Sequence, residues 1–71
     1  MNFAERLKAL RKEHGLTQRR LADKVGISIN CISWYERGEI EPRLFVLCCL
    51  ADYFGVSMDY LLGRSEVKNA R

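Results

Sequence analysis

The side chains of this 71-residue chain that could do chemistry lie between Thr17 and Arg43, and their chemistry is recognition rather than catalysis. Asn30 can donate and accept hydrogen bonds at the same time, which matches the edge that adenine presents in the major groove of DNA. Ile29 beside it could pack on a thymine methyl group. The residues expected to face outward here are Ser28, Ile29, Asn30, Ser33 and Trp34.

Two short helices and a tight turn are needed to hold these side chains, and residues 17–36 carry the signals for them. Thr17 and Ser28 are suitable N-caps, and Gly26 supplies the left-handed residue with which a helix often ends. The inner faces of the two helices would be formed by Leu21, Ala22, Val25, Cys31, Ile32 and Tyr35. This pattern predicts a helix-turn-helix, a unit that places its second helix in the major groove; an ordinary helical hairpin is the alternative.

Four arginines around this unit are candidates for contact with the DNA backbone. Arg19 and Arg20 fall in the first turn of the first helix, where two cations oppose the helix dipole unless a phosphate offsets them. Simple solvation is the alternative for each of these two. Arg37 ends the second helix, and Arg43 could reach the backbone or the minor groove.

Trp34, Glu39 and Glu41 complicate this surface. A large aromatic residue on a polar face is costly to expose. Trp34 therefore packs along the sugar-phosphate backbone, pins Asn30 and Ser33 in place, or folds back over the domain without meeting DNA. Acidic groups near phosphates weaken the sequence-independent part of binding, so we expect a modest affinity or one that depends on dimerisation.

Hydrophobic periodicity predicts an all-α chain with three further helices: residues 3–14, residues 43–54 and a short helix after Ser57. Asn2 and Glu5 have the spacing of a capping box. The predicted inner faces of these helices are Phe3, Leu7 and Leu10; Leu44, Leu47, Cys48 and Ala51; and Met58, Leu61 and Leu62.

Length and charge bound the organisation of the chain. Residues 1–63 are expected to form one domain, and residues 64–71 a polar tail that frays. The net charge is +3, and residues 1–43 hold nine basic against six acidic residues, which fits a surface that faces phosphate. No apolar run approaches membrane-spanning length and no signal peptide is evident, so a cytoplasmic location is expected.

Metal, disulfide and catalytic sites are not predicted. Cys31, Cys48 and Cys49 lack C-x-x-C spacing, and His14 is the only histidine, so we expect reduced cysteines that act as small apolar residues. One histidine, no paired carboxylates in an expected cleft and no glycine-rich phosphate loop argue against an enzyme. No cofactor or small-molecule ligand is predicted.

The run from Phe3 to Gly63 resembles the phage Cro and repressor family of helix-turn-helix domains, often called Xre-like. The matching segments are ERLKALR, GLTQRRLADKVGIS, ISWYERGEIEP and LADYFGVSMDYLLGR. The resemblance implies a compact five-helix, lambda-repressor-like domain that binds double-stranded DNA at a pseudo-palindromic operator as a homodimer. It also implies that Gln18 contacts a phosphate and that Arg11 and Glu36 form a partly buried ion pair.

The fourth and fifth helices carry an apolar surplus that is a candidate dimer interface: Phe45, Val46, Cys49, Leu61 and Leu62. The alternative is that these residues cover the core of the monomer. The leading hypothesis is a sequence-specific transcriptional regulator, a repressor of phage, controller or mobile-element type. A helix-turn-helix module that binds protein, such as an antitoxin or anti-repressor, is the alternative.

Overall fold

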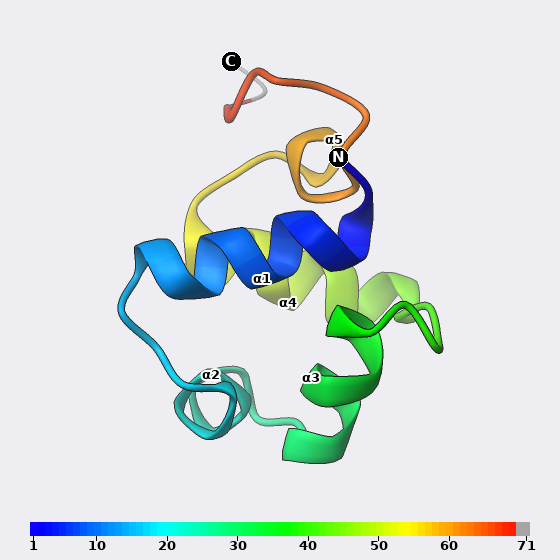
Figure 1. Ribbon diagram of the computed structural model, residues 1–71. Helices are drawn as coiled ribbons and strands as arrows, with labels where there is room; N and C mark the ends of the chain where they lie inside the picture. Colours follow the sequence, from blue (N-terminus) through cyan, green and yellow to red (C-terminus); the bar gives the residue numbers. More distant parts are fainter. Residues whose placement is uncertain (70–71) are drawn as a thin grey trace.

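The computed structural model describes residues 1–69, which form five helices and no strand. The helices are α1 (Phe3–Glu13), α2 (Gln18–Val25), α3 (Ile29–Glu36), α4 (Leu44–Phe54) and α5 (Met58–Leu61). In Figure 1, α1 crosses in front of α4, with α2 and α3 on one side of this pair and α5 on the other. The predicted all-α, five-helix fold is confirmed. No helix in the described range is long and apolar enough to cross a membrane.

Local hydrogen bonds begin most of the helices as the sequence predicts. Asn2 and Glu5 form the capping box of α1, with the two reciprocal bonds at 2.9 and 3.1 Å. Thr17, Ser28 and Ser57 each accept a hydrogen bond from the backbone N–H three residues further on, and so cap α2, α3 and α5. Each cap satisfies a donor that the helix itself leaves unpaired.

The core draws buried side chains from all five helices. They are Leu7, Leu10, Leu21, Ala22, Ile32, Tyr35, Leu50, Ala51, Phe54, Tyr60 and Leu61. Helix α3 packs on both α1 and α2, while α4 packs on α2 and α5. The pair α2–α3 is therefore held by the rest of the domain and does not stand as an isolated hairpin.

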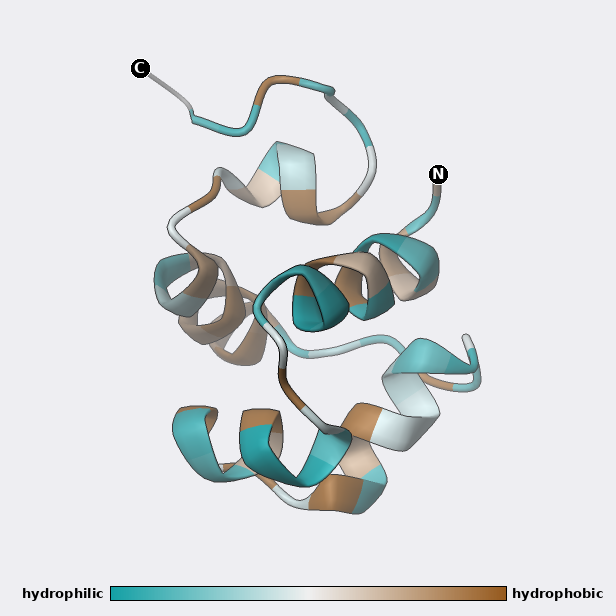
Figure 2. Cartoon of the chain, turned by 60° about the vertical axis from the view of Figure 1, so that its left-hand side comes forward, coloured by the Kyte–Doolittle hydropathy of each residue, from teal (hydrophilic) through white to brown (hydrophobic). Residues whose placement is uncertain are grey.

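The inner face of α4 differs from the predicted one. Its buried residues are Leu50, Ala51 and Phe54. Leu44, predicted to face inward, is 68 % exposed, and Leu47 and Cys48 are only half-buried. Figure 2 shows the reason: α4 is apolar over most of its length, so periodicity cannot select a face and packing against neighbouring helices decides it.

Two glycines are required by the path of the backbone. Gly26 has a φ of +75°, the left-handed value that ends α2 and starts the turn toward α3. Gly63 has a φ of +78°, and a Cβ at this position would collide with the carbonyl oxygen of Met1. Gly63 therefore allows the amino end of the chain to lie against the end of α5.

Two hydrogen bonds join the tail to the start of α5, and the fraying of the tail stays a prediction. The Ser57 N–H donates to the carbonyl of Lys68, and the Ser57 hydroxyl lies 3.4 Å from the carbonyl of Val67. In Figure 1 this segment runs beside α5, at the end of the molecule away from α2 and α3. The last two residues of the predicted tail, 70–71, lie outside the described residues.

Arg6 is a buried charged residue that the sequence analysis missed. Its side chain is 3 % exposed, and its guanidinium lies 3.8 Å from the centre of the Tyr60 ring. One Nη donates to the Tyr60 carbonyl at 3.0 Å, and the other donates to Glu66 at 3.0 Å. The Nε lies 3.1 Å from the Met1 sulfur. The charge is thus met by a carbonyl, an aromatic face and a carboxylate from the tail.

Candidate nucleic-acid interface

An ion pair between α1 and α3 fixes the position of the helix-turn-helix. Arg11 donates from Nε to one Glu36 oxygen at 2.7 Å and from Nη2 to the other at 3.0 Å. The remaining Nη1 donates to the carbonyl of Leu16 at 2.8 Å. The side chains of Arg11 and Glu36 are 11 % and 3 % exposed. The expected pair is therefore present, bidentate and more buried than expected, a geometry that makes charge-assisted bonds strong.

Gln18 belongs to the same network. Its side-chain nitrogen donates to Glu36 Oε1 at 3.1 Å, and the side chain is half-buried at the start of α2. An amide nitrogen carries two hydrogens, so one remains for a further acceptor. The network holds that donor beside the first turn of α2, whose backbone N–H groups attract anions. The phosphate contact of Gln18 stays a prediction.

The outward face of α3 carries most of the residues expected to meet bases. Ser28 and Asn30 are exposed, Ser33 is half-buried, and Trp34 keeps 39 % of its surface exposed. Ile29 instead packs partly against the core, which reduces the apolar surface that it can offer to a thymine methyl group.

The inward face of α3 is buried in the core. Ile32 is fully buried and Tyr35 is 5 % exposed. Burial, together with the neighbouring Cys31 thiol, raises the pKa of the Tyr35 hydroxyl above its ordinary value, while Arg43 lowers it slightly. Tyr35 therefore stays neutral at physiological pH, and α3 presents one face to the core and the other to solvent.

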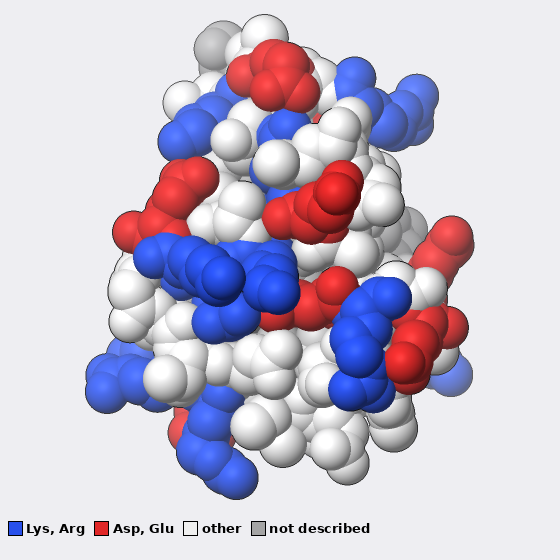
Figure 3. Space-filling view, viewed as in Figure 1, with Lys and Arg blue, Asp and Glu red and all other residues white. Residues whose placement is uncertain are grey.

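The four candidate arginines divide into two groups. Within residues 1–69, Arg19, Arg20 and Arg43 are exposed and make no ion pair. Arg37 is paired with Glu39, with N···O distances of 2.8 and 3.2 Å. Figure 3 shows that acidic and basic side chains are interspersed on one face of the molecule and do not form a single basic surface.

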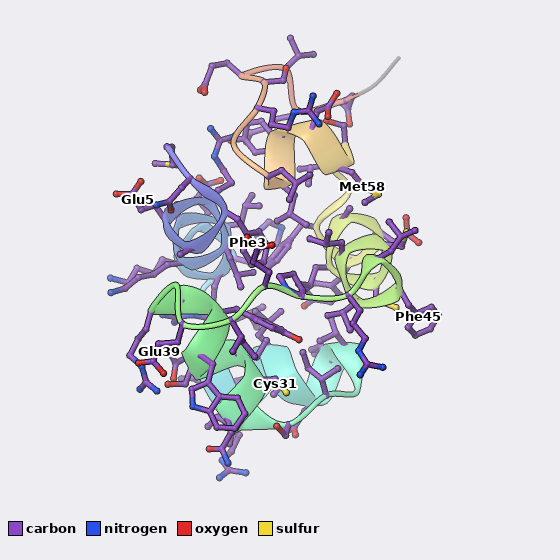
Figure 4. All side chains as sticks on the ribbon, turned by 90° about the vertical axis from the view of Figure 1, so that its right-hand side faces the viewer. Phe3, Glu5, Cys31, Glu39, Phe45 and Met58 are labelled. Atoms are coloured by element: carbon purple, nitrogen blue, oxygen red, sulfur yellow. The ribbon has the colours of Figure 1, made fainter. Side chains whose placement is uncertain are left out.

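The predicted dimer surface is only partly available. Phe45 is 77 % exposed and points away from the domain in Figure 4, while Val46, Cys49 and Leu62 are half-buried. Leu61 is fully buried in the core, so its assignment to an interface was wrong: it packs inside the monomer. Leu44, which the prediction assigned to the core, is exposed next to Phe45. We call Leu44, Phe45, Val46 and Cys49 the α4 patch.

The chain has curated relatives among bacterial and phage regulators. It is 42 % identical over 67 residues to the HTH-type transcriptional regulator ImmR of Bacillus subtilis, covering 94 % of this chain and 53 % of ImmR. It is 41 % identical over 64 residues to the cryptic phage CTXphi transcriptional repressor RstR of Vibrio cholerae, covering 90 % of this chain and 57 % of RstR. The chain thus spans little more than half the length of these relatives.

A solved structure and a family model agree with these matches. The P22 c2 repressor, crystallised in complex with a synthetic operator, superposes with a TM-score of 0.85 and 37 % identity, over 92 % of this chain and 98 % of that chain. A family model described as helix-turn-helix (HTH_3) matches residues 7–61. On the fold, the helix-turn-helix and these matches, the chain belongs to the HTH_3 family of Xre-like helix-turn-helix proteins.

Proposed function

We propose that this chain is the sequence-specific DNA-binding domain of a transcriptional regulator, a repressor of phage, controller or mobile-element type that acts in the cytoplasm on double-stranded DNA and has no catalytic role. The observation that carries the proposal is the helix-turn-helix locked onto α1 by Arg11 and Glu36, with the polar face of α3 open to solvent. The names of its relatives and the operator complex of the P22 c2 repressor support the same function.

In this proposal each part of the surface has its own task. Asn30 reads a base edge in the major groove, because its amide can donate and accept together. Gln18 and the first turn of α2 hold a phosphate, and so fix the register of α3 on the duplex. The guanidinium groups of Arg19, Arg20 and Arg43 are exposed and make no ion pair within residues 1–69, and they supply the salt-dependent part of the affinity.

Substitutions at Asn30, Gln18 and Arg19 test this division of tasks. Asn30→Ala removes a base contact, so it should cost about 1–3 kcal/mol on the preferred operator and hardly change binding to scrambled DNA. Gln18→Ala should weaken binding to all sequences about equally and leave the salt slope intact, because no cation is lost. Arg19→Ala should also weaken all binding and reduce the slope by up to about one unit.

The measurement is a titration of each variant on an operator selected from a random duplex library and on a scrambled duplex, at several salt concentrations. The parent chain is the reference for each duplex. If Asn30→Ala weakened both duplexes by the same factor, α3 would not be reading bases as proposed. If the parent chain bound no duplex even at low salt, DNA binding itself would be wrong.

We further propose that the domain binds DNA as a homodimer that uses the α4 patch. One recognition helix reads only a few base pairs, and two copies would read half-sites about one DNA turn apart. Adjacent exposed Leu44 and Phe45 are large apolar side chains that a second copy would cover.

Sedimentation of a charged variant of the α4 patch tests the homodimer. Phe45→Glu should shift the chain toward monomer, whereas Val67→Glu, at an exposed apolar residue of the tail, should not. Equal association of Phe45→Glu and the parent chain would remove the α4 patch from the interface.

A protein-binding role, as in an antitoxin or anti-repressor, is the second candidate function. The observations that favour it are the exposed acidic residues Glu39 and Glu41 after α3 and the α4 patch, in which Leu44 and Phe45 are exposed. This role predicts no salt-dependent affinity for any duplex in the library, so the same titration separates the two functions.

A further inference from the structure

Each of the three nitrogens of the Arg37 guanidinium donates a hydrogen bond within the chain. Nε and Nη2 donate to the two Glu39 oxygens at 2.8 and 3.2 Å, and Nη1 donates to the Ser33 hydroxyl at 2.9 Å. Both members of the ion pair are about half exposed, at 54 % and 52 %, so the pair lies in solvent and not in the core. Arg37 therefore differs from Arg19, Arg20 and Arg43, which make no ion pair within residues 1–69.

This arrangement lies on the face of α3 proposed to meet DNA. Asn30, Ser33 and Arg37 follow one another at intervals of three and four residues, which places them along one side of a helix. Glu39 follows in the turn after α3, as Figure 4 shows. Its carboxylate accepts hydrogen bonds from Nε and Nη2 of Arg37. A guanidinium on this face without a carboxylate partner could donate to a phosphate oxygen.

We propose that Glu39 competes with DNA phosphate for Arg37, so that this chain gives up sequence-independent affinity at one arginine and keeps that arginine as a support for Ser33. The inference rests on the proposed DNA-binding function and adds a residue that sets its specificity. A guanidinium that is already neutralised by a carboxylate releases fewer counterions from DNA when it binds. An exposed ion pair is weak enough for phosphate to displace, but displacement leaves a carboxylate beside the DNA backbone.

The hydrogen bond from Arg37 to Ser33 explains how a loss of sequence-independent affinity can favour selectivity among DNA sequences. Because Arg37 donates to the Ser33 oxygen, that oxygen acts as an acceptor toward the protein, and its own hydrogen is left for an outside acceptor. The base atoms that accept in the major groove are N7 of either purine, O6 of guanine and O4 of thymine. Glu39 holds Arg37 in place, and Arg37 in turn holds the Ser33 hydroxyl in this role.

Glu39→Gln tests the proposal, because glutamine keeps the size of the side chain and removes its charge. Binding to a scrambled duplex of about 20 base pairs, two turns long, is measured across a range of salt concentrations. We expect Glu39→Gln to raise the affinity for this duplex roughly threefold to tenfold, and to steepen the salt slope by up to about one unit. The selected operator should gain less, so the ratio between the two affinities should narrow.

A double substitution separates release of Arg37 from the simple removal of a negative charge. In an Arg37→Gln background, Glu39→Gln should no longer steepen the slope, because the cation that it frees is absent. Glu41→Gln is the matched control: it removes the same charge two residues away, and Glu41 makes no ion pair within the described part of the chain. This control should change the slope less than Glu39→Gln does.

Three results would overturn the proposal. One is an unchanged affinity and slope in Glu39→Gln, and another is an equal gain with and without Arg37. The third is an equal gain from Glu41→Gln. These outcomes presuppose a parent chain that binds DNA; a parent chain that binds no duplex at low salt would instead remove the proposed function, and this inference with it. The unfolding midpoint of each variant in urea verifies that the affinities refer to folded protein.

Discussion

Helix α1 carries two arginines, five positions apart, whose side chains are fully or largely buried, and the domain accommodates them in different ways. Arg11 meets a carboxylate that is itself buried, Glu36, in a bidentate pair. Arg6 meets the Tyr60 carbonyl and ring, and its carboxylate partner, Glu66, is 83 % exposed. A buried cation can thus be stabilised by one matched anion, or by a carbonyl, an aromatic ring and an exposed carboxylate together.

The two arrangements also join different parts of the chain. Arg11 and Glu36 connect α1 to α3, and so position the helix proposed to read DNA. Arg6 connects α1 to α5 and the tail, at the end of the molecule away from α2 and α3 in Figure 1. Replacing either partner should therefore cost a similar free energy of unfolding at the Arg11–Glu36 site. At the Arg6 site, replacing Arg6 should cost more than replacing Glu66.

The largest effect is expected at the matched pair. Glu36→Ala leaves Arg11 buried without its anion and also removes the acceptor of Gln18, so it should lower the free energy of unfolding by about 3 kcal/mol or more. Arg11→Ala should cost a similar amount, because it leaves Glu36 uncompensated. Urea denaturation measures both. A loss below about 1 kcal/mol for either would mean that water compensates the remaining charge.

A smaller effect is expected from the backbone contact beside Arg6. Gly63→Ala combines a left-handed backbone with a collision against the Met1 carbonyl, so we expect it to destabilise by about 2 kcal/mol or more. Gly15→Ala is the matched control, because Gly15 has a φ of +66° but open space around its Cβ position. It should cost about 1 kcal/mol. Equal unfolding free energies for the two variants would show that the amino end is not held there.

The Arg6 site itself should respond asymmetrically. Arg6→Ala removes a buried stem, the hydrogen bonds to the Tyr60 carbonyl and to Glu66, and a cation–π contact, and should cost on the order of 2 kcal/mol. Glu66→Ala removes a partner that is mostly in water, and should cost less than about 1 kcal/mol. Chemical denaturation of the two variants gives the comparison. Equal losses would make this site a matched pair like Arg11 and Glu36.

The smallest effect concerns the inner face of α3. The pKa of Tyr35 is raised by burial, so the folded state favours the neutral phenol and the unfolded state ionises first. This stabilisation is complete below the ordinary tyrosine pKa, and is lost as the pH rises through the ordinary and then the raised value. Between about pH 9 and about pH 11, Tyr35→Phe should therefore lose less stability than the parent chain. The measurement is the free energy of unfolding of both proteins as a function of pH. If the two pH profiles ran parallel across this interval, the raised pKa of Tyr35 would be contradicted.

Much of the domain follows from short-range features of the sequence. Helix starts at Asn2, Thr17, Ser28 and Ser57 and the turn at Gly26 depend on residues at most four positions apart, so their chemistry can be read directly from the chain. The pairing of Arg11 with Glu36 was available through the family resemblance, because the fold places α1 and α3 in contact.

Tertiary packing decided the rest. In the apolar helix α4 the pattern is compatible with more than one inner face, and only its neighbours select Leu50 over Leu44. Leu61 was assigned to an interface because the sequence alone does not show which apolar residues are buried in the core. The burial of Arg6 depends on contacts with Tyr60 and Glu66, which lie 54 and 60 positions further along the chain. Local periodicity carries no information about contacts at such separations. Residues close together in the sequence determine where each helix begins and ends. Whether a charged or an apolar side chain is buried depends instead on the tertiary contacts that the folded chain makes with it.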